Sequence, residues 1–409
     1  LVLDNQKRIY TLCLRMTGDP EDGQDLAQEA FLNAWRGLPG FKGDSSFATW
    51  VYRLAGNACL DFLRRKKRRQ GVEGGPSMDD EEGGWAEPAD PRQDPEGETL
   101  RRELKQAVEE LGYPVYRNNI GNVIVTVEGE DDTEPVALSA HVDTLGLMVR
   151  SITSDGQLMI TPVGGPLLPS LEGEYCNIHT RDGRVYTGTI LSLSPSVHVF
   201  DDASTRERNA ANMAVRIDEV VHSKEDVEAL GIQAGDFVCY DPKTTFTKSG
   251  FLKSRFIDDK ACSALELTLL KIMKEEQIKP KHKTYLCFST HEEIGYGGAT
   301  LPKDIKELLV VDMGCVGLDL NCTEEQVSIC AKDSSGPFDY EMTTRLVNLA
   351  KQHEIDAVTD IYPHYGSDAA AAWKAGYDVR AALIGPGVHA SHGMERTHMK
   401  GLMNTLKLC

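Results

Sequence analysis

The stretch TYLCFSTHEEIGYGGA, residues 284–299, places two carboxylates, Glu292 and Glu293, side by side where an apolar run ends. Neighbouring like charges repel each other, and the repulsion costs more close to a packed core. The run is rich in β-branched and aromatic residues and is followed by glycines, which predicts a buried strand leading into a loop. A solvated turn would also explain the pair. Ligand sites in open α/β sheets lie at the carboxyl ends of strands, so metal and proton chemistry is the second interpretation.

Metal-ligand residue types recur at the ends of other predicted elements. Each has a plainer explanation by itself, because a lone histidine is usually a hydrogen-bonded core residue and an aspartate at a helix start is usually a cap. Together they have the composition that borderline or hard divalent cations prefer. One shared site explains them better than separate coincidences. The residues are His141 and Asp143 after VALSA, Asp258 and Asp259 in SRFIDDKAC, Asp312 after LLVV, and His389, His392 and His398 in GVHASHGMERTH.

From Tyr113 onward, the elements that would position these residues follow an α/β pattern. NVIVTVEG, PVALSAHVDTLGLMV, KTYLCFST and ELLVVDMG are predicted strands, and ALELTLLKIMKEEQ is a predicted helix. This alternation indicates a sheet with parallel members. At one edge of such a sheet, one carboxylate of the Glu292 and Glu293 pair could bind a cation while the other accepts a proton from water. Residues 160–248 instead contain short alternating strands, with a hairpin predicted around Arg181–Gly183.

The first part of the chain has a different pattern. Apolar residues recur at helical spacing through residues 5–70, in IYTLCLRM, DLAQEAFLNAW and FATWVYRLAGNACLDFL, and the run ends in the basic stretch Arg64–Arg69. Basic and aromatic side chains there could contact phosphates and unpaired bases, although a helical domain with a solvated tail has the same pattern. Residues 71–98 are acidic, poor in aliphatic side chains and predicted to be a disordered linker. A short amphipathic helix is predicted over Thr99–Gly112.

Composition limits the class of protein. A chain of 409 residues predicts two or three domains, and its net charge of −19 opposes general nucleic-acid binding. Hydrophobic residues make up 41%, with no apolar run long enough to span a bilayer and no secretory signal at the start, so we expect a cytoplasmic protein with no membrane partner. Ten cysteines without a CxxC pair are typical of reduced thiols rather than disulfides.

Residues 112–409 resemble the glutamyl and deblocking aminopeptidases, a family of dinuclear metallopeptidases known for tetrahedral self-compartmentalised assemblies. The resemblance is carried by AHVDTLGLMV, IDDKACSALE, STHEEIGYGGA, VVDMG, HYGSDAAA and GVHASHGMERTH. It implies a phosphorylase/hydrolase-like α/β fold, a sheet sandwiched by helices, over residues 99–159 and 249–409. An inserted β-barrel domain over residues 160–248 would mediate homo-oligomerisation. The implied activity is removal of N-terminal residues from short peptides.

The resemblance also implies a ligand set for two divalent metal ions, which could be zinc, cobalt or manganese. Asp258 would bridge the two ions. His141 and Asp312 would complete the shell of one ion, and Glu293 and His392 would complete the shell of the other.

Two further residues would support the chemistry. Glu292 would be the general base, and Asp143 would orient the imidazole of the histidine on its own strand. Asp368, in GSDA, matches a family position near the site without an assigned role. Asp259 and His389 lie within three residues of the chosen ligands and are the alternatives to them.

Residues 1–70 resemble region 2 of a bacterial sigma-70-family factor of the extracytoplasmic-function type, through DPEDGQDLAQEAFLNAWRGLPGFKGDSSFATWVYRLAGNACLDFLRRKKRR. The resemblance implies an all-α module in which Asp25–Trp35 binds core RNA polymerase and Phe47–Arg69 faces the −10 element of promoter DNA. The region 4 helix-turn-helix of such factors is not found downstream. Two alternatives to a peptidase are therefore a transcription initiation factor with a non-catalytic C-terminal domain and an accidental fusion of two reading frames. The complete set of chemical groups favours the peptidase.

Overall fold

The computed structural model describes residues 95–409 continuously and, before them, residues 9–14, 17, 19–37, 51, 55, 58, 59 and 62. The chain divides into two compact units, residues 1–87 and 88–409. Most of the predicted linker lies outside the described residues. Helix α4 (Pro95–Leu111) begins four residues before the expected start of its helix.

Within the first unit, the described residues pack around an apolar core. Helix α2 (Pro20–Gly37) begins where the side chain of Asp19 accepts the main-chain N–H of Asp22, which caps the helix. Leu26 and Ala30 of α2 are buried, whereas Asp25 faces solvent. The helical prediction therefore holds for the whole of the proposed polymerase-binding segment, Asp25–Trp35. Most of residues 47–69, predicted to face the promoter, lies outside the described residues.

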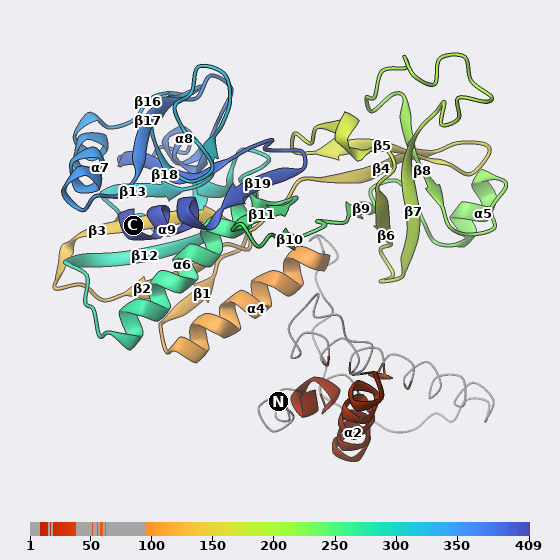
Figure 1. Cartoon of the computed structure of the whole chain (residues 1–409), viewed down its shortest axis with the longest axis horizontal. Coiled ribbons are helices and arrows are strands. Elements are labelled where there is room, and N and C mark those ends of the chain that lie inside the picture. The colour runs from red at the N-terminus through yellow and green to blue at the C-terminus, as the bar shows by residue number, and fades with distance from the viewer. Residues whose placement is uncertain are drawn as a thin grey trace. The chain divides into compact units, whose positions relative to one another are not determined.

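The second unit is built on a ten-stranded mixed sheet (Figure 1). Strands β12, β3, β13 and β18 run parallel, and Ser289 at the end of β12 lies opposite His141 at the end of β3. Parallel strands in this register end at one edge of the sheet, which brings their following residues together. The strand order is β1 (Val115–Arg117), β2 (Val123–Val127), β12 (His282–Ser289), β3 (Asp131–His141), β13 (Glu307–Val311), β18 (Arg380–Val388), β15 (Val327–Asp333) and β16 (Gly336–Pro337), with β14 (Gly314–Cys315) on β18 and β17 (Ala357–Ile361) on β15.

Helices cover both faces of this sheet. On one face, α4, α6 (Ile257–Glu275), α7 (Tyr340–Gln352) and α9 (Met399–Leu408) contribute to one apolar core through residues such as Val108, Leu270 and Leu346. On the other face, α8 (Asp368–Lys374) contributes Ala369 and Ala372 to a second core, next to the short helix η3 (Gly297–Thr300). The predicted sheet between helices is confirmed.

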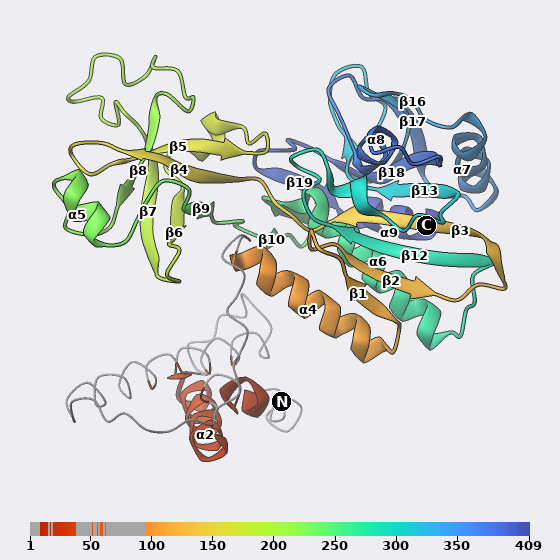
Figure 2. The same cartoon turned by 180° about the vertical axis from the view of Figure 1, so that it is seen from behind.

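A closed six-stranded barrel is inserted after β3 (Figures 1 and 2). Its core is lined by inward residues such as Leu147, Ile178 and Val215. The hairpin predicted around Arg181–Gly183 joins β6 to β7. The barrel order is β4 (Gly146–Ile152), β5 (Leu158–Val163), β8 (Met213–Ile217), β7 (Val185–Ser192), β6 (Tyr175–His179) and β9 (Phe237–Tyr240), with α5 (Lys224–Ala229) between β8 and β9.

The barrel takes in residues 146–159, which the sequence reading had assigned to the α/β region. PVALSAHVDTLGLMV is nearly continuous in apolar residues, so its pattern does not mark the point where the chain leaves the sheet. After β9 the chain forms a small sheet of β10 (Thr245–Phe246), β11 (Phe251–Ser254) and β19 (Glu395–His398).

All ten cysteines are free, and seven of them are buried. In the described part of the chain, every helix is too short or too polar to cross a membrane.

Candidate active site

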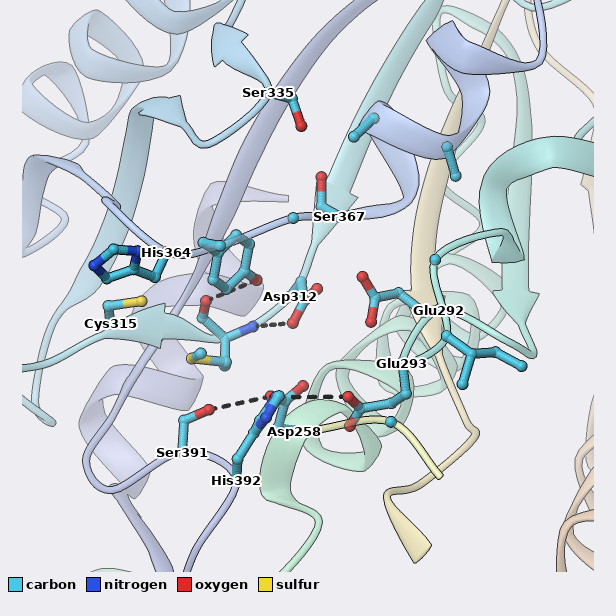
Figure 3. A pocket seen from close by; sticks show the side chains of 18 of the residues that line it. Asp258, Glu292, Glu293, Asp312, Cys315, Ser335, His364, Ser367, Ser391 and His392 are labelled. Atoms are coloured by element: carbon cyan, nitrogen blue, oxygen red, sulfur yellow. Dashed lines mark hydrogen bonds and ion pairs between the residues drawn. The ribbon is translucent and has the colours of Figure 1, made fainter. Parts of the chain in front are cut away.

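Four chain segments deliver their polar side chains to one edge of the sheet. His141 ends β3, the loop after β12 carries Glu292 and Glu293, and Asp312 follows β13. Asp258 lies in the first turn of α6, where the backbone of Asp258 departs from helical geometry. Figure 3 shows Asp258, Glu292, Glu293 and Asp312 facing one cavity.

His141 is the innermost member of the group, with 1% of its surface exposed. Its Nε2 lies 3.0 Å from Asp258 Oδ1 and 3.7 Å from Glu292 Oε2. Its Nδ1 lies 3.1 Å from the carbonyl oxygen of Asp143 and 3.5 Å from the carboxylate of that residue. The orienting role predicted for Asp143 would therefore be carried by its backbone carbonyl more than by its side chain.

Two groups of donor atoms are close enough to hold a cation. His141, Asp258 and Glu293 form one group, and His141, Asp259 and Asp312 form the other, with the atoms of each group within 4.8 Å of one another. Asp259, predicted only as an alternative to Asp258, therefore lies in the cluster together with Asp258. Its Oδ2 accepts the main-chain N–H of His141 at 3.1 Å, and its buried Oδ1 has no hydrogen-bond partner.

His392 reaches the group from the loop between β18 and β19. Its Nε2 lies 3.5 Å from Glu293 Oε2 and 3.7 Å from Asp258 Oδ2 (Figure 3), and 39% of its side chain is exposed. The carbonyl of Gly165, beyond the barrel strand β5, lies 2.9 Å from the other ring nitrogen. All five predicted metal ligands and the predicted base therefore lie in one cluster.

The alternative histidine does not join this cluster. His389 is exposed and its backbone pairs with Arg396 in an isolated bridge. His398 lies near β11, with its Nε2 2.9 Å from the carbonyl of Ser249. Of the three histidines in GVHASHGMERTH, all of which the structure describes, His392 is the one that contacts Asp258 and Glu293.

Asp368 lies beneath the site, at the start of α8. Its Oδ2 accepts hydrogen bonds from Ser139 Oγ at 2.7 Å and Ser289 Oγ at 2.5 Å. Both serines precede site residues on their strands, by two positions in β3 and by three in the β12 loop. Asp368 therefore links the two strands that carry His141 and Glu292.

Burial and mutual repulsion alter the protonation of the carboxyl groups. Burial, helped by the charge of Asp258, raises the pKa of Asp312 to about 7. Burial also raises the pKa values of Glu292 and Glu293 well above their ordinary range. A nearby cation would stabilise the ionised form of each of these carboxyl groups, because its charge offsets both the loss of hydration and the repulsion between carboxylates.

For His141 and Asp258, the effect of neighbouring groups on the pKa outweighs the effect of burial. Burial alone lowers the pKa of His141, but its contacts with Asp143 and Asp258 outweigh burial and hold the pKa well above the ordinary value. Burial would raise the pKa of Asp258, but His141 outweighs it and lowers the pKa.

Sequence reasoning missed Glu395, which supports the site from β19. Its carboxylate accepts the main-chain N–H of Asp258 at 3.1 Å and of His392 at 3.0 Å. Burial and the charge of Asp258 raise its pKa to about 8. Its place three residues after His392 was the available signal, but the spacing alone does not distinguish a support from a solvated acid.

The site opens into a cavity of about 840 Å³. Carboxylates line one part of it, and His364, Ser335 and Lys374 contribute polar groups elsewhere on its wall. A hydrolytic site needs a cavity of this kind next to its reactive groups, because the substrate must reach them.

The buried cluster contains groups that could hold a metal ion, and the sequence comparisons identify the class of protein. The sequence model of the M42 glutamyl aminopeptidase family matches residues 121–408. The chain therefore belongs to the M42 family of peptidases.

Individual relatives agree with this assignment. The putative aminopeptidase YhfE of Bacillus subtilis (strain 168) is 49% identical over 306 residues, which cover 75% of this chain and 88% of the relative. The TET1 peptidase of Pyrococcus horikoshii, whose structure is described as assembling into a tetrahedron or a large octahedral shell, has the same fold. The TM-score is 0.65 at 22% identity, over 76% of this chain and 92% of that one.

A second family model, sigma-70 region 2, matches residues 1–69. The RNA polymerase sigma-H factor of Pseudomonas aeruginosa is 46% identical over 69 residues, which are 17% of this chain and 36% of the relative. The chain thus spans about a third of that sigma factor. Both resemblances drawn from the sequence are confirmed.

Proposed function

We propose that the chain is a dinuclear metallo-aminopeptidase that removes N-terminal residues from short peptides. One observation carries the proposal: histidine and carboxylate side chains from separate parts of the chain meet in one cluster beside a cavity. Family membership supports the same reaction class. A non-catalytic C-terminal domain would not need these charges to be buried together, since burying unpaired carboxylates costs free energy.

The residues present fit two divalent cations. Glu293 Oε1 is a buried carboxylate oxygen without a hydrogen-bond partner, as expected of an atom that ligates a metal. Asp258 would bridge the two ions, with His141 and Asp312 on one side and Glu293 and His392 on the other. Imidazole and carboxylate ligands suit zinc, cobalt and manganese alike, so the donor set does not choose among them.

When bound, the cations would lower the pKa of water and polarise the scissile carbonyl. The protein's own residues do the rest. Glu292, whose pKa is raised by burial, accepts a proton from the attacking water and donates it to the leaving amine. The free α-amine of a peptide would bind next to the same ligands when the cations are present, which favours cleavage at the N-terminus.

Substitution of Glu292 by Gln tests this proposal. The purified protein is assayed on short peptides and on their N-acetylated forms, with zinc, cobalt or manganese added. We expect metal-dependent release of N-terminal residues from the free peptides only, and a rate about 10²- to 10⁴-fold lower in Glu292→Gln, the range typical of a lost general base. Equal rates in the two proteins would refute the role of Glu292. Absence of turnover with any of these metals would refute the activity.

We also propose that the protein assembles as a homo-oligomer through the barrel. The support is the shared fold with the assembling TET1 peptidase and a set of large apolar side chains exposed on the barrel, such as Tyr175, Val185 and Val220. Analytical ultracentrifugation of the full chain measures the mass, and a monomer at micromolar concentration would contradict this assignment.

A second function is favoured for the N-terminal unit. The match to sigma-70 region 2 supports binding of core RNA polymerase through Asp25–Trp35 and contact with promoter DNA through Phe47–Arg69. Pull-down of purified core polymerase by the full chain tests it. Failure to retain the polymerase would remove this function without affecting the peptidase.

A further inference from the structure

The loop that carries both glutamates is held at its two ends by one side chain, that of Asn122. This residue lies just before β2 and is fully buried. Its Oδ1 accepts the main-chain N–H of Thr290 at 2.9 Å, and its Nδ2 donates to the carbonyl of Gly297 at 3.0 Å. Thr290 and Gly297 bracket the loop, so one amide group sets the distance between its ends.

The middle of the loop is held by a second side chain. Asp143 Oδ1 accepts the main-chain N–H of Glu292, and Oδ2 accepts that of Glu293, each at 3.2 Å. Charged acceptors make the stronger class of hydrogen bond. Asn122 and Asp143 therefore satisfy backbone groups at the start, middle and end of one short segment.

Packing prevents the loop from moving toward α8. A Cβ atom on Gly297 would come within 2.6 Å of Asp368 Oδ1, and one on Gly298 within 2.1 Å of the Asp368 carbonyl. The backbone of these glycines therefore already lies against α8.

Asn122 is itself fixed from the β1–β2 turn. Its main-chain N–H donates to Asn118 Oδ1 at 2.9 Å, while Asn118 Nδ2 donates to Thr300 Oγ1 at 3.0 Å. Asn122 is therefore held by contacts next to the sheet and on η3, outside the loop. These contacts fix the position of the loop relative to the sheet.

We propose that Asn122 is a positioning residue that sets Glu292 and Glu293 against the rest of the cluster. It has no hydrogen bond to either glutamate side chain, and its amide group instead bonds the main-chain N–H and hydroxyl of Thr290, the carbonyl of Gly297 and the hydroxyl of Thr300. The inference rests on the proposed function for its kinetic consequence, but its structural consequence, the order of residues 291–297, does not depend on any activity.

The test compares Asn122→Ser, Asn122→Asp and the control Thr405→Val in the full chain. Serine is too short to reach both ends of the loop, whereas aspartate keeps the acceptor for Thr290 and loses the donor to Gly297. Thr405 is equally buried and loses one hydrogen bond within α9, to the carbonyl of Gly401. Thr405→Val therefore loses a buried hydrogen bond, as the Asn122 variants do, but changes no contact with the loop.

Hydrogen exchange and steady-state kinetics are both measured. In Asn122→Ser we expect the amide hydrogen-exchange rates of residues 291–297 to rise by about tenfold or more. This is the effect of losing the net free energy of one hydrogen bond that opposes local opening of the loop. We expect kcat to fall by about 100-fold, the size of effect given by a displacement of about 1 Å, with KM changed less than about threefold. Asn122→Asp should show both changes at smaller size, and Thr405→Val neither.

Two results would overturn the inference. One is unchanged exchange of residues 291–297 in both Asn122 variants, and the other is a fall in kcat no larger than that of Thr405→Val. If Asn122→Ser does not fold, Asn122→Asp decides by the same criteria. If the unmodified protein cleaves no peptide, the proposed function fails, and the exchange measurement alone still decides whether Asn122 holds the loop.

Discussion

The two halves of the proposed metal centre are held very differently. His141 and Asp312 follow central parallel strands and are almost fully buried, whereas His392 sits on a loop with a left-handed backbone and remains partly exposed. Strand ends are fixed by the hydrogen-bonded ladder on each side, while a loop residue depends on a few local contacts. The inner half of the metal centre is therefore part of the folded core, whereas the outer half lies in the cavity wall that a substrate would contact.

The largest effect is expected at the inner half. His141→Ala removes a ligand of the inner ion and also the imidazole whose Nε2 lies 3.0 Å from Asp258, the side chain proposed to bridge both ions. We expect loss of both metal ions and a fall in kcat/KM of more than about 10³-fold, since the proposed chemistry needs the cations. Metal content by atomic emission and peptide turnover measure it. His389→Ala is the control, and similar losses in both variants would contradict the assignment.

A smaller effect is expected at the outer half. His392→Ala leaves the inner ligands in place, so we expect one metal ion to be retained and the thermal midpoint to change by less than that of His141→Ala. Metal content after dialysis and differential scanning fluorimetry provide the comparison. Loss of both ions in His392→Ala would show that the two halves are not separable as the burial suggests.

The protonation of the cluster gives a third test. The pKa values of Asp312 and Glu395, about 7 and about 8, are higher than those of unfolded carboxyl groups, so the folded protein holds these protons more tightly. The metal-free protein should lose stability as pH rises from about 4, the ordinary carboxyl pKa, to about 8, by up to about 1.4 kcal/mol per pH unit for each proton that the folded protein holds and the unfolded chain has released. Urea unfolding with chelator present measures it.

Metal should cancel or reverse this slope, because ligands must be deprotonated to bind cations. The same unfolding series with metal added is the matched control. A metal-free protein that becomes more stable between pH 6 and 8 would mean that the buried carboxyl groups are not protonated as their surroundings require.

The smallest effect is expected from the first unit. Residues 1–87 form one compact unit and the proposed site lies wholly within the other, so removal of the first unit should leave kcat/KM within about twofold. Peptide turnover by the shortened chain measures it. A larger loss would show that the sigma-like unit contributes to the peptidase.

The sequence by itself determined much of the architecture and which side chains meet at the sheet edge. Strand runs that end in His141, Glu292 and Asp312 predict a shared sheet edge, because parallel strands place their carboxyl ends together. Local pattern was enough here, since each residue directly follows an apolar strand of clear period. The same reasoning separated the helical first part of the chain from the α/β part.

Only the tertiary structure decided which neighbours join the site and where the barrel begins. Asp259 and Glu395 look in the sequence like an ordinary cap and a solvated acid, and their roles depend on contacts with residues more than a hundred positions away. Asn122 lies 168 residues from Thr290 and carries no local mark of that contact. Such side chains acquire their function from long-range packing, and a single sequence does not encode long-range distances in its local periodicity.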